Sequence, residues 1–191
     1  MTAIADFETV LQFWFGRVEE TVVPSENRAR IWFGEESDID QEIKDQFSST
    51  LTAFLNGECQ DWLSSGRGQL AAIILLDQFS RHIHRDTEKA YAQDEMALEI
   101  CLQGIESESE HDLSLIERVF YYFPLLHSED IGYQELSVQY YQMLTELAFS
   151  ETRVIFDSFL KFAKHHYAII QNFGRFPQRN SFLFRESTPP E

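Results

Sequence analysis

The sequence predicts an all-α protein, with seven or eight helices that form a bundle or an array of α-hairpins of the helical-repeat kind. Apolar residues recur at intervals of three and four from end to end of the 191-residue chain, which is the spacing of amphipathic helices. Runs of alternating Val, Ile and Thr, which would indicate strands, are missing from the sequence.

The N-terminal part of the chain predicts two short helices that end at glycine. The first is expected from about Ile4 to Phe15, because Gly16 can adopt the left-handed conformation that often ends a helix. The second follows Pro24 and ends in the same way at Gly34. Both close with the triplet Trp-Phe-Gly, which we interpret as an aromatic helix stop because the surrounding residues do not repeat.

Two longer amphipathic helices are expected next. Ser37 and Asp40 have the spacing of a capping box, and the helix that they begin closes at Gly57. Its apolar stripe consists of Ile39, Ile43, Phe47, Leu51 and Phe54. A short segment around residues 61–65 then leads to a strongly apolar helix from Leu70 to about Arg81.

Four further helices are expected in the remainder of the chain. Their approximate ranges are 87–104, 109–123, 129 or 130–147, and 151–173. Pro124 is expected to end the second of these, because proline cannot continue a helix without losing a hydrogen bond. Gly174 is expected to end the last. We expect residues 1–186 to form a single all-helical domain and residues 187–191 to be a frayed tail.

Charge and cysteine content disfavour several classes of protein. Thirty-two acidic residues against fifteen lysines and arginines leave a formal charge of −17, which disfavours binding to nucleic acid or anionic membranes. The two cysteines, Cys59 and Cys101, are far apart and predict reduced buried thiols. The sequence shows neither a signal-peptide pattern nor an apolar run of membrane length. We therefore expect a cytoplasmic protein that binds neither nucleic acid nor membrane.

Three expected helices carry a charged or polar residue on their apolar face. Asp77, with Arg81 one turn later, continues the apolar face of its helix, and Asp94 lies among the small residues of the next one. His166 is the only polar member of a stripe in the last helix that otherwise consists of Ile155, Phe159, Phe162, Ile169 and Phe173. We expect these side chains to point inward, where a carboxylate needs a cation or a backbone donor.

Residues 166–185 are the one locally basic stretch and can supply these cations. They include three arginines, among them Arg175 and Arg179, and no Asp or Glu. We expect this stretch to fold back over the bundle so that its arginines form ion pairs with Asp77 and Asp94. Such pairs could hold the segment in place without any ligand, because structural ion-pair networks imitate functional sites.

The number of arginines and histidines also predicts a binding site. Loops between the expected helices add further residues of both types to those of the C-terminal stretch. A surplus of guanidinium groups suits an anionic small molecule or peptide group, because arginine pairs bidentately with carboxylate and phosphate. The predicted groove is lined by Arg81, Arg85, His127, Arg175 and Arg179. The oligomeric state stays open.

Two alternative functions remain open. One is a hydrolase or transferase that acts on a small phosphorylated or carboxylated compound. In such an enzyme His127 or His166 would be the general base, oriented by Asp77 or Glu129. The other alternative is a protein–protein scaffold. No nucleophile elbow, phosphate-binding loop or dinucleotide fingerprint occurs, and no helix carries two metal ligands at the spacing of a metal site. The sequence thus predicts no metal site and leaves the cofactor open.

Short motifs spread over almost the whole chain carry a family resemblance. They include Trp32-Phe33-Gly34, Leu76-Asp77-Gln78-Phe79-Ser80-Arg81, Tyr122-Phe123-Pro124 with His127-Ser128-Glu129, and Phe173-Gly174-Arg175-Phe176-Pro177. With these motifs the sequence resembles the bacterial domain-of-unknown-function family 924. The resemblance implies an all-helical, tetratricopeptide-like fold, and it implies no established activity, substrate or cofactor. The sequence departs from the family pattern with Ser80 for proline, His82 for asparagine, Gln178 for histidine and Phe184 for glycine.

Overall fold

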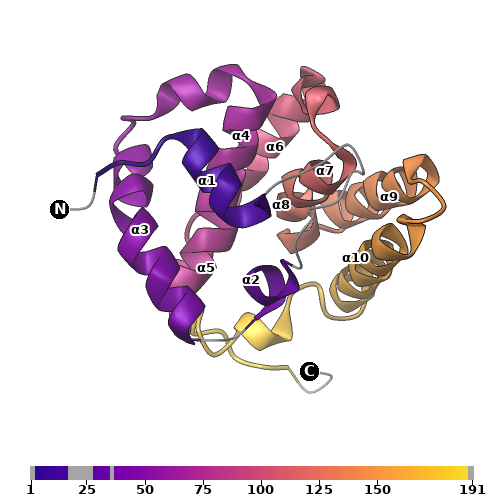
Figure 1. Ribbon diagram of the computed structural model, residues 1–191. Coiled ribbons are helices and arrows are strands. Elements are labelled where there is room, and N and C mark those ends of the chain that lie inside the picture. The colour runs from indigo at the N-terminus through magenta and orange to yellow at the C-terminus, as the bar shows by residue number, and fades with distance from the viewer. Residues whose placement is uncertain (1–2, 17–27, 35–36, 189–191) are drawn as a thin grey trace.

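The computed structural model describes residues 3–16, 28–34 and 37–188. These residues form ten α-helices joined by turns and short helical segments, and they include no β-strand (Figure 1). The predicted all-α class is therefore confirmed. Some of the ten helices follow one another directly, and counted as continuous units they number eight, the upper value of the prediction.

The α-helices are α1 (Phe7–Phe15), α2 (Ala29–Phe33), α3 (Ser37–Leu55), α4 (Gly66–Ile73), α5 (Ser80–Ile83), α6 (Asp94–Glu106), α7 (Leu115–Tyr121), α8 (Phe123–His127), α9 (Ile131–Leu147) and α10 (Arg153–Phe173). Four 3₁₀ segments connect them, namely η1 (Gln60–Ser64), η3 (Glu88–Tyr91), η4 (Ser109–Asp112) and η5 (Pro177–Arg179). The segment η2 (Ile74–Phe79) is a π-helix between α4 and α5.

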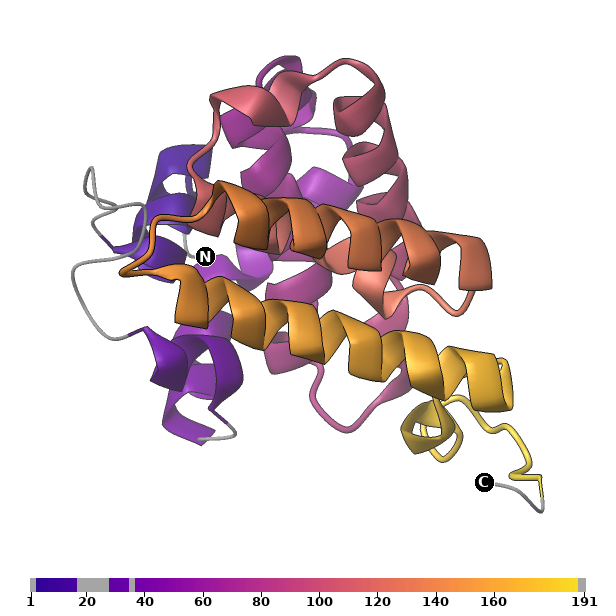
Figure 2. The ribbon, with the colours of Figure 1, turned by 90° about the vertical axis from the view of Figure 1, so that its right-hand side faces the viewer.

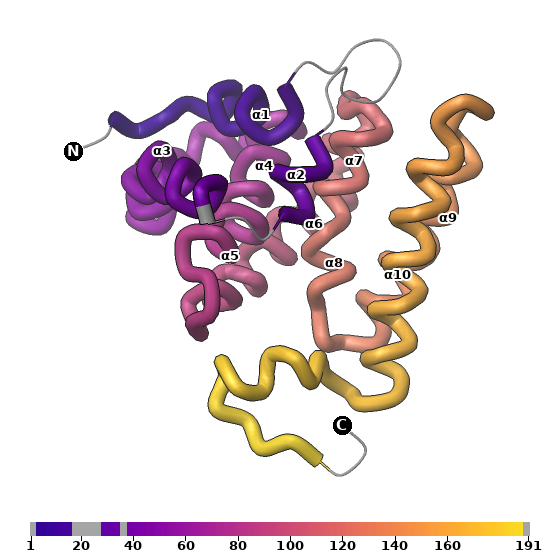
Figure 3. Tube along the Cα trace, turned by 60° about the horizontal axis from the view of Figure 1, so that its bottom comes forward, coloured from indigo at the N-terminus to yellow at the C-terminus, as the bar shows by residue number. Residues whose placement is uncertain are grey.

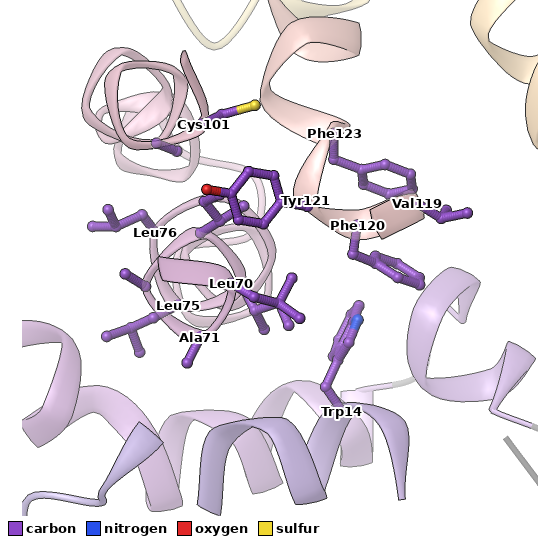
Figure 4. Close-up of a cluster of buried hydrophobic side chains, with 14 of the residues drawn as sticks. Trp14, Leu70, Ala71, Leu75, Leu76, Cys101, Val119, Phe120, Tyr121 and Phe123 are labelled. Atoms are coloured by element: carbon purple, nitrogen blue, oxygen red, sulfur yellow. The ribbon is translucent and has the colours of Figure 1, made fainter. Parts of the chain in front are cut away.

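The core is built around one continuous helix of residues 66–83, which consists of α4, η2 and α5. Residues 70–76 of this helix are all apolar and fully buried. A helix that is apolar on every side has to be surrounded, and α1, α3, α6 and α7 pack round this one. Figure 4 shows its side chains pointing in several directions, with Trp14 of α1 and Phe120 of α7 nearby. Neither this helix nor any other in the described residues is long and apolar enough to cross a membrane.

Helices α9 and α10 form an antiparallel hairpin on one side of the molecule (Figure 2). Helix α9 packs on α7 and α8, and α10 packs along α9. Helix α10 ends at Gly174, whose φ of 69° is the left-handed value that glycine adopts without strain. Beyond it, residues 174–188, which we call the C-terminal segment, run back across the end of the bundle toward α5 (Figure 3).

Several helix boundaries differ from the prediction. Helices α6 and α7 begin later than the predicted residues 87 and 109, because Glu88–Tyr91 and Ser109–Asp112 form separate 3₁₀ segments. The central helix begins at Gly66, four residues before the predicted start.

The start of α1 and the role of Pro124 also differ from the prediction. Helix α1 begins at Phe7, three residues later than predicted, because the Asp6 carboxylate accepts a hydrogen bond from the backbone N of Thr9 at 2.7 Å and caps the helix there. Pro124 does not end a helix but lies in the first turn of α8, where its missing N–H costs no hydrogen bond. Pro24, and residues 189–191 of the predicted tail, lie outside the described residues.

The predicted inward face of α10 is wrong in part. The residues that this helix buries are Phe156, Phe159, Leu160, Ala163 and Ile170. Ile155 and Phe162 of the predicted stripe are instead 36% and 38% exposed. Both stripes are apolar at helical spacing, so periodicity alone does not decide which one faces the core. The consequence is an apolar surface on α10 that is only partly covered.

The close approach of α4 to η1 depends on Gly68. A Cβ atom at this position would lie 2.0 Å from the backbone oxygen of Trp62, far inside van der Waals contact. We predict that Gly68→Ala lowers the free energy of unfolding by roughly 2–3 kcal/mol, because the two backbones have to move apart. The control is Gly132→Ala, where the nearest atom is a side-chain oxygen of Asp130 at 3.1 Å. Urea denaturation compares the two, and equal stabilities would contradict the prediction.

Candidate functional site

A small cavity lies at the end of the bundle that the C-terminal segment crosses. It has a volume of about 140 Å³. It is lined by Arg81, Tyr91, His127, His166, Phe176, Gln178 and Arg179. These residues come from α5, η3, α8, α10 and the C-terminal segment, so that five parts of the chain meet there. Three of the five ligand residues predicted from sequence, namely Arg81, His127 and Arg179, are among them.

Asp77 lies beside this cavity on the π-helix η2, and its side chain is completely buried. Its Oδ1 lies 2.8 Å from His127 Nδ1 and 3.1 Å from Arg81 Nη1, and Gln78 donates a hydrogen bond to Oδ2. Burial alone would raise the pKa of Asp77, but the Arg81 charge and the hydrogen bonds with His127 and Gln78 hold it well below its usual value. Asp77 is therefore ionised at neutral pH.

His127, the last residue of α8, is fixed in one tautomer by this carboxylate. An ionised carboxylate only accepts hydrogen bonds, so Nδ1 carries the proton and donates it to Asp77. The other ring nitrogen, Nε2, then presents a lone pair, and no described residue forms a hydrogen bond with it. Burial lowers the pKa of His127 against the opposing pull of Asp77, so the ring is neutral at pH 7.

Arg81 and Arg179 share the carboxylate of Asp94 at the beginning of α6. Arg81 Nη2 lies 3.0 Å from Asp94 Oδ2, and Arg179 Nη1 lies 3.2 Å from the same oxygen. The Arg179 guanidinium also donates to the backbone oxygen of His127 at 3.0 Å. It lies 4.8 Å from the ring centre of Tyr91 and 4.7 Å from that of Phe176, and these contacts fix its plane. Burial lowers the pKa of Arg179, which nevertheless stays charged beside Asp94.

His166 of α10 forms the opposite wall of the cavity. Its ring centre lies 6.3 Å from that of His127 and 5.3 Å from that of Phe176. Nδ1 lies 3.0 Å from the backbone oxygen of Phe162, and because a carbonyl oxygen only accepts, Nδ1 is the donor. Burial lowers the pKa of His166 to about 4. A second neutral imidazole, whose Nε2 carries a lone pair, thus faces the cavity.

The site has no surplus of positive charge among the described residues that form it, in contrast to the prediction from sequence. Two guanidinium groups are matched by two carboxylates, and both imidazoles are neutral. The reason is that the other predicted arginines lie elsewhere. Arg85 donates to Asp40 of α3 at 2.6 Å, and Arg175 does not line the cavity. No three metal-binding side chains gather anywhere in the described part of the chain.

Glu129, the other predicted partner of a histidine, has a different position. Arg185 Nη1 lies 2.6 Å from its Oε2, and the backbone N of Phe176 donates to Oε1 at 2.8 Å. Glu129 therefore attaches the C-terminal segment to the start of α9 and contacts neither His127 nor His166. Hydrogen bonds from Arg185 and Phe176 lower its pKa despite partial burial.

Sequence reasoning missed three residues of the cavity wall, namely Tyr91, Phe176 and Gln178. Phe176 and Gln178 flank Pro177 in the basic stretch, so the aromatic and polar residues between its arginines were a usable signal. Tyr91 belongs to the short helix η3, and its position beside two arginines depends on tertiary packing alone.

The chain is similar to known proteins over almost its whole length. A family described as a bacterial protein of unknown function, DUF924, matches residues 10–191. The chain belongs to this family. A solved structure, described as the protein of unknown function ATU0120 from Agrobacterium tumefaciens, is 31% identical to this chain, with a TM-score of 0.77. The match covers 96% of this chain and 92% of that one. No curated protein matches.

The structure places three of the residues at which the sequence was expected to depart from the family pattern. Gln178 lies in the cavity wall. Phe184 adopts a φ of 54°, a left-handed value at which glycine is unstrained and phenylalanine is not. The hydroxyl of Ser80 is buried without a hydrogen-bond partner, whereas a proline ring there would leave no polar side-chain group to satisfy.

The low pKa of His166 predicts a pH dependence of stability. The unfolded chain protonates this residue at about pH 6.5 and the folded chain at about pH 4, so acidification from 6.5 to 4 favours the unfolded state. We predict that His166→Gln makes the fall in unfolding free energy over this range shallower. Urea denaturation at several pH values measures it, with the exposed His111→Gln as control. If the free energy of unfolding falls equally steeply on acidification in the wild type and in His166→Gln, the prediction is wrong.

Proposed function

We propose that the cavity binds a small molecule through one anionic group, a carboxylate or a phosphate, together with a proton. The observation that supports this most directly is that two arginines and two neutral imidazoles line the same 140 Å³ space. Arg179 is held rigidly by its aromatic neighbours and by Asp94, so the loss of side-chain entropy on binding is small. A site of this size encloses a single functional group.

The proton is required by the charge balance of the site. With Arg81 and Arg179 matched by Asp77 and Asp94, an anion added alone would leave one uncompensated negative charge in a buried place. His127 offers the compensation, because its Nε2 has a lone pair and Asp77 stabilises the imidazolium form. The protonated Nε2 would then donate a hydrogen bond to the bound anion.

The first test measures binding of acetate and inorganic phosphate by calorimetry and thermal shift. A ligand at about one hundred times its Kd stabilises the native state by roughly 2.7 kcal/mol, which is readily seen as a rise in Tm. We predict that Arg179→Gln abolishes binding. Arg175→Gln removes the same charge from the same segment but not from the cavity, and it should bind like the wild type. Binding that is lost in Arg175→Gln and kept in a folded Arg179→Gln would contradict the proposed site.

The coupled proton predicts how affinity depends on pH. Acetate keeps its own charge between pH 6.5 and 8, where the free His127 is neutral because burial lowers its pKa. If one proton binds with each acetate, the Kd rises by about tenfold for each pH unit. We predict this slope for the wild type and its absence in His127→Gln, measured by NMR titration. A Kd that is independent of pH in the wild type would exclude proton uptake.

A second candidate function is catalysis by the pair of Asp77 and His127. The specific observation is the oriented imidazole of a cavity-lining histidine, whose Nδ1 is bonded to a carboxylate and whose Nε2 carries the lone pair that a general base needs. The arginines would stabilise negative charge that develops on a phosphorylated or carboxylated substrate during hydrolysis or group transfer.

This candidate predicts turnover on a panel of small phosphoesters, esters and amides. His127→Gln should lower kcat by roughly 10²–10⁴-fold, and the exposed His111→Gln should leave it unchanged. The kcat of the wild type should fall at low pH as His127 becomes protonated. A pure, folded protein that turns over none of these compounds would count against catalysis and leave the binding proposal intact.

A further inference from the structure

An exposed apolar strip runs along α10 and α2 next to the cavity. Phe33, Ile155 and Phe162 are 53%, 36% and 38% exposed. Phe159 lies beneath them, with its ring centre 6.0 Å from that of Phe33, so α2 and α10 are in contact here (Figure 1). Large apolar side chains that gather on a surface indicate a binding surface more often than isolated ones do.

The strip is continuous with the cavity wall. The ring centre of Phe162 lies 4.3 Å from that of His166, and His166 lines the cavity. Below the strip, Phe159 contacts Phe123 of α8 at 6.4 Å, and Phe123 contacts His127 at 5.5 Å. His166 therefore borders directly on the strip, and His127 is linked to it through the buried rings of Phe123 and Phe159.

The size of the cavity indicates what the strip binds. Pockets that enclose a whole small molecule usually have volumes of about 300–1,000 Å³, and this one has about 140 Å³. It encloses a head group, and the remainder of a larger ligand has to lie outside. Phe162 lies four residues before His166, about 6 Å along α10, so the strip is the adjoining apolar surface.

We infer that the ligand is an amphipathic acid, whose anionic head occupies the cavity and whose apolar chain lies along Phe162 and Phe33. This inference rests on the proposed anion site. The charge of the head is compensated by the coupled proton, the arginines donate hydrogen bonds to it, and the chain covers side chains that otherwise face water. A purely polar ligand would leave the strip unused.

The test compares straight-chain carboxylates from acetate to octanoate by calorimetry, below the concentration at which octanoate forms micelles. Burial of each methylene should lower the Kd by roughly fourfold. Phe162→Ser should bind acetate like the wild type and octanoate at least tenfold more weakly. The control is Phe149→Ser, because Phe149 is 60% exposed and belongs to the turn between α9 and α10. Thermal unfolding checks that both variants are folded.

The outcomes separate this inference from the proposal on which it rests. If affinity rises with chain length in the wild type and in Phe149→Ser but not in Phe162→Ser, the apolar chain of the ligand binds on the strip. Equal affinity for acetate and octanoate overturns the inference that the chain binds on the strip, and it leaves the proposed anion site unaffected. Absence of binding to every carboxylate overturns the inference, and absence of binding to inorganic phosphate as well overturns the anion site. The inference is also overturned if affinity still rises with chain length in Phe162→Ser. It is overturned as well if the wild type is a dimer that Phe162→Ser dissociates, because the strip would then be a dimer interface.

Discussion

The buried charge of Asp77 is the constraint on which one end of this molecule depends. Its carboxylate has no access to water and meets His127 of α8 and Arg81 of α5. Removing one partner of a buried pair costs several kcal/mol, because the other charge is left uncompensated. Helix α8 and the end of the central helix therefore have to stay together. Asp94 extends the cluster from Arg81 to Arg179, so the C-terminal segment is joined to the same charge.

The π-helix explains how an apolar central helix accommodates this acid. A π-turn inserts one residue, which rotates the residues after it by about 100° relative to a continuous α-helix. The buried residues 70–76 fill the core, and of the residues that follow, Asp77 bonds to His127 of the cavity wall and Arg81 lines the cavity. Such insertions lower the stability of a helix without improving its packing, and they are found often at functional sites. Here the insertion contains Asp77 and Gln78, which bond to each other.

Much of this arrangement could be predicted from the sequence, because local patterns decide it. The apolar stripe before Asp77 points that residue into the core, and Gly174 marks the end of α10. The features that could not be predicted depend on contacts between residues that are far apart in the sequence. Arg85 reaches Asp40, forty-five residues away, so the expected surplus of positive charge does not form at the cavity. The inward face of α10 could not be predicted either. Both of its stripes are apolar, and packing against the neighbouring helices decides which of them is buried.

A purely structural role for the cluster explains its ion pairs but not its imidazoles. The pairs of Asp77 and Asp94 with the two arginines would attach the C-terminal segment without any ligand. That role needs no open space, and an apolar side chain in place of His166 would fill the cavity and avoid the cost of burying a titratable ring. Instead, His127 and His166 both line the cavity, and each uses Nδ1 to fix its ring and so keeps the lone pair of Nε2 for another partner. The site thus has two neutral imidazoles beside two arginines whose charges are already balanced. A ligand that brings both a negative charge and a proton therefore stabilises it most.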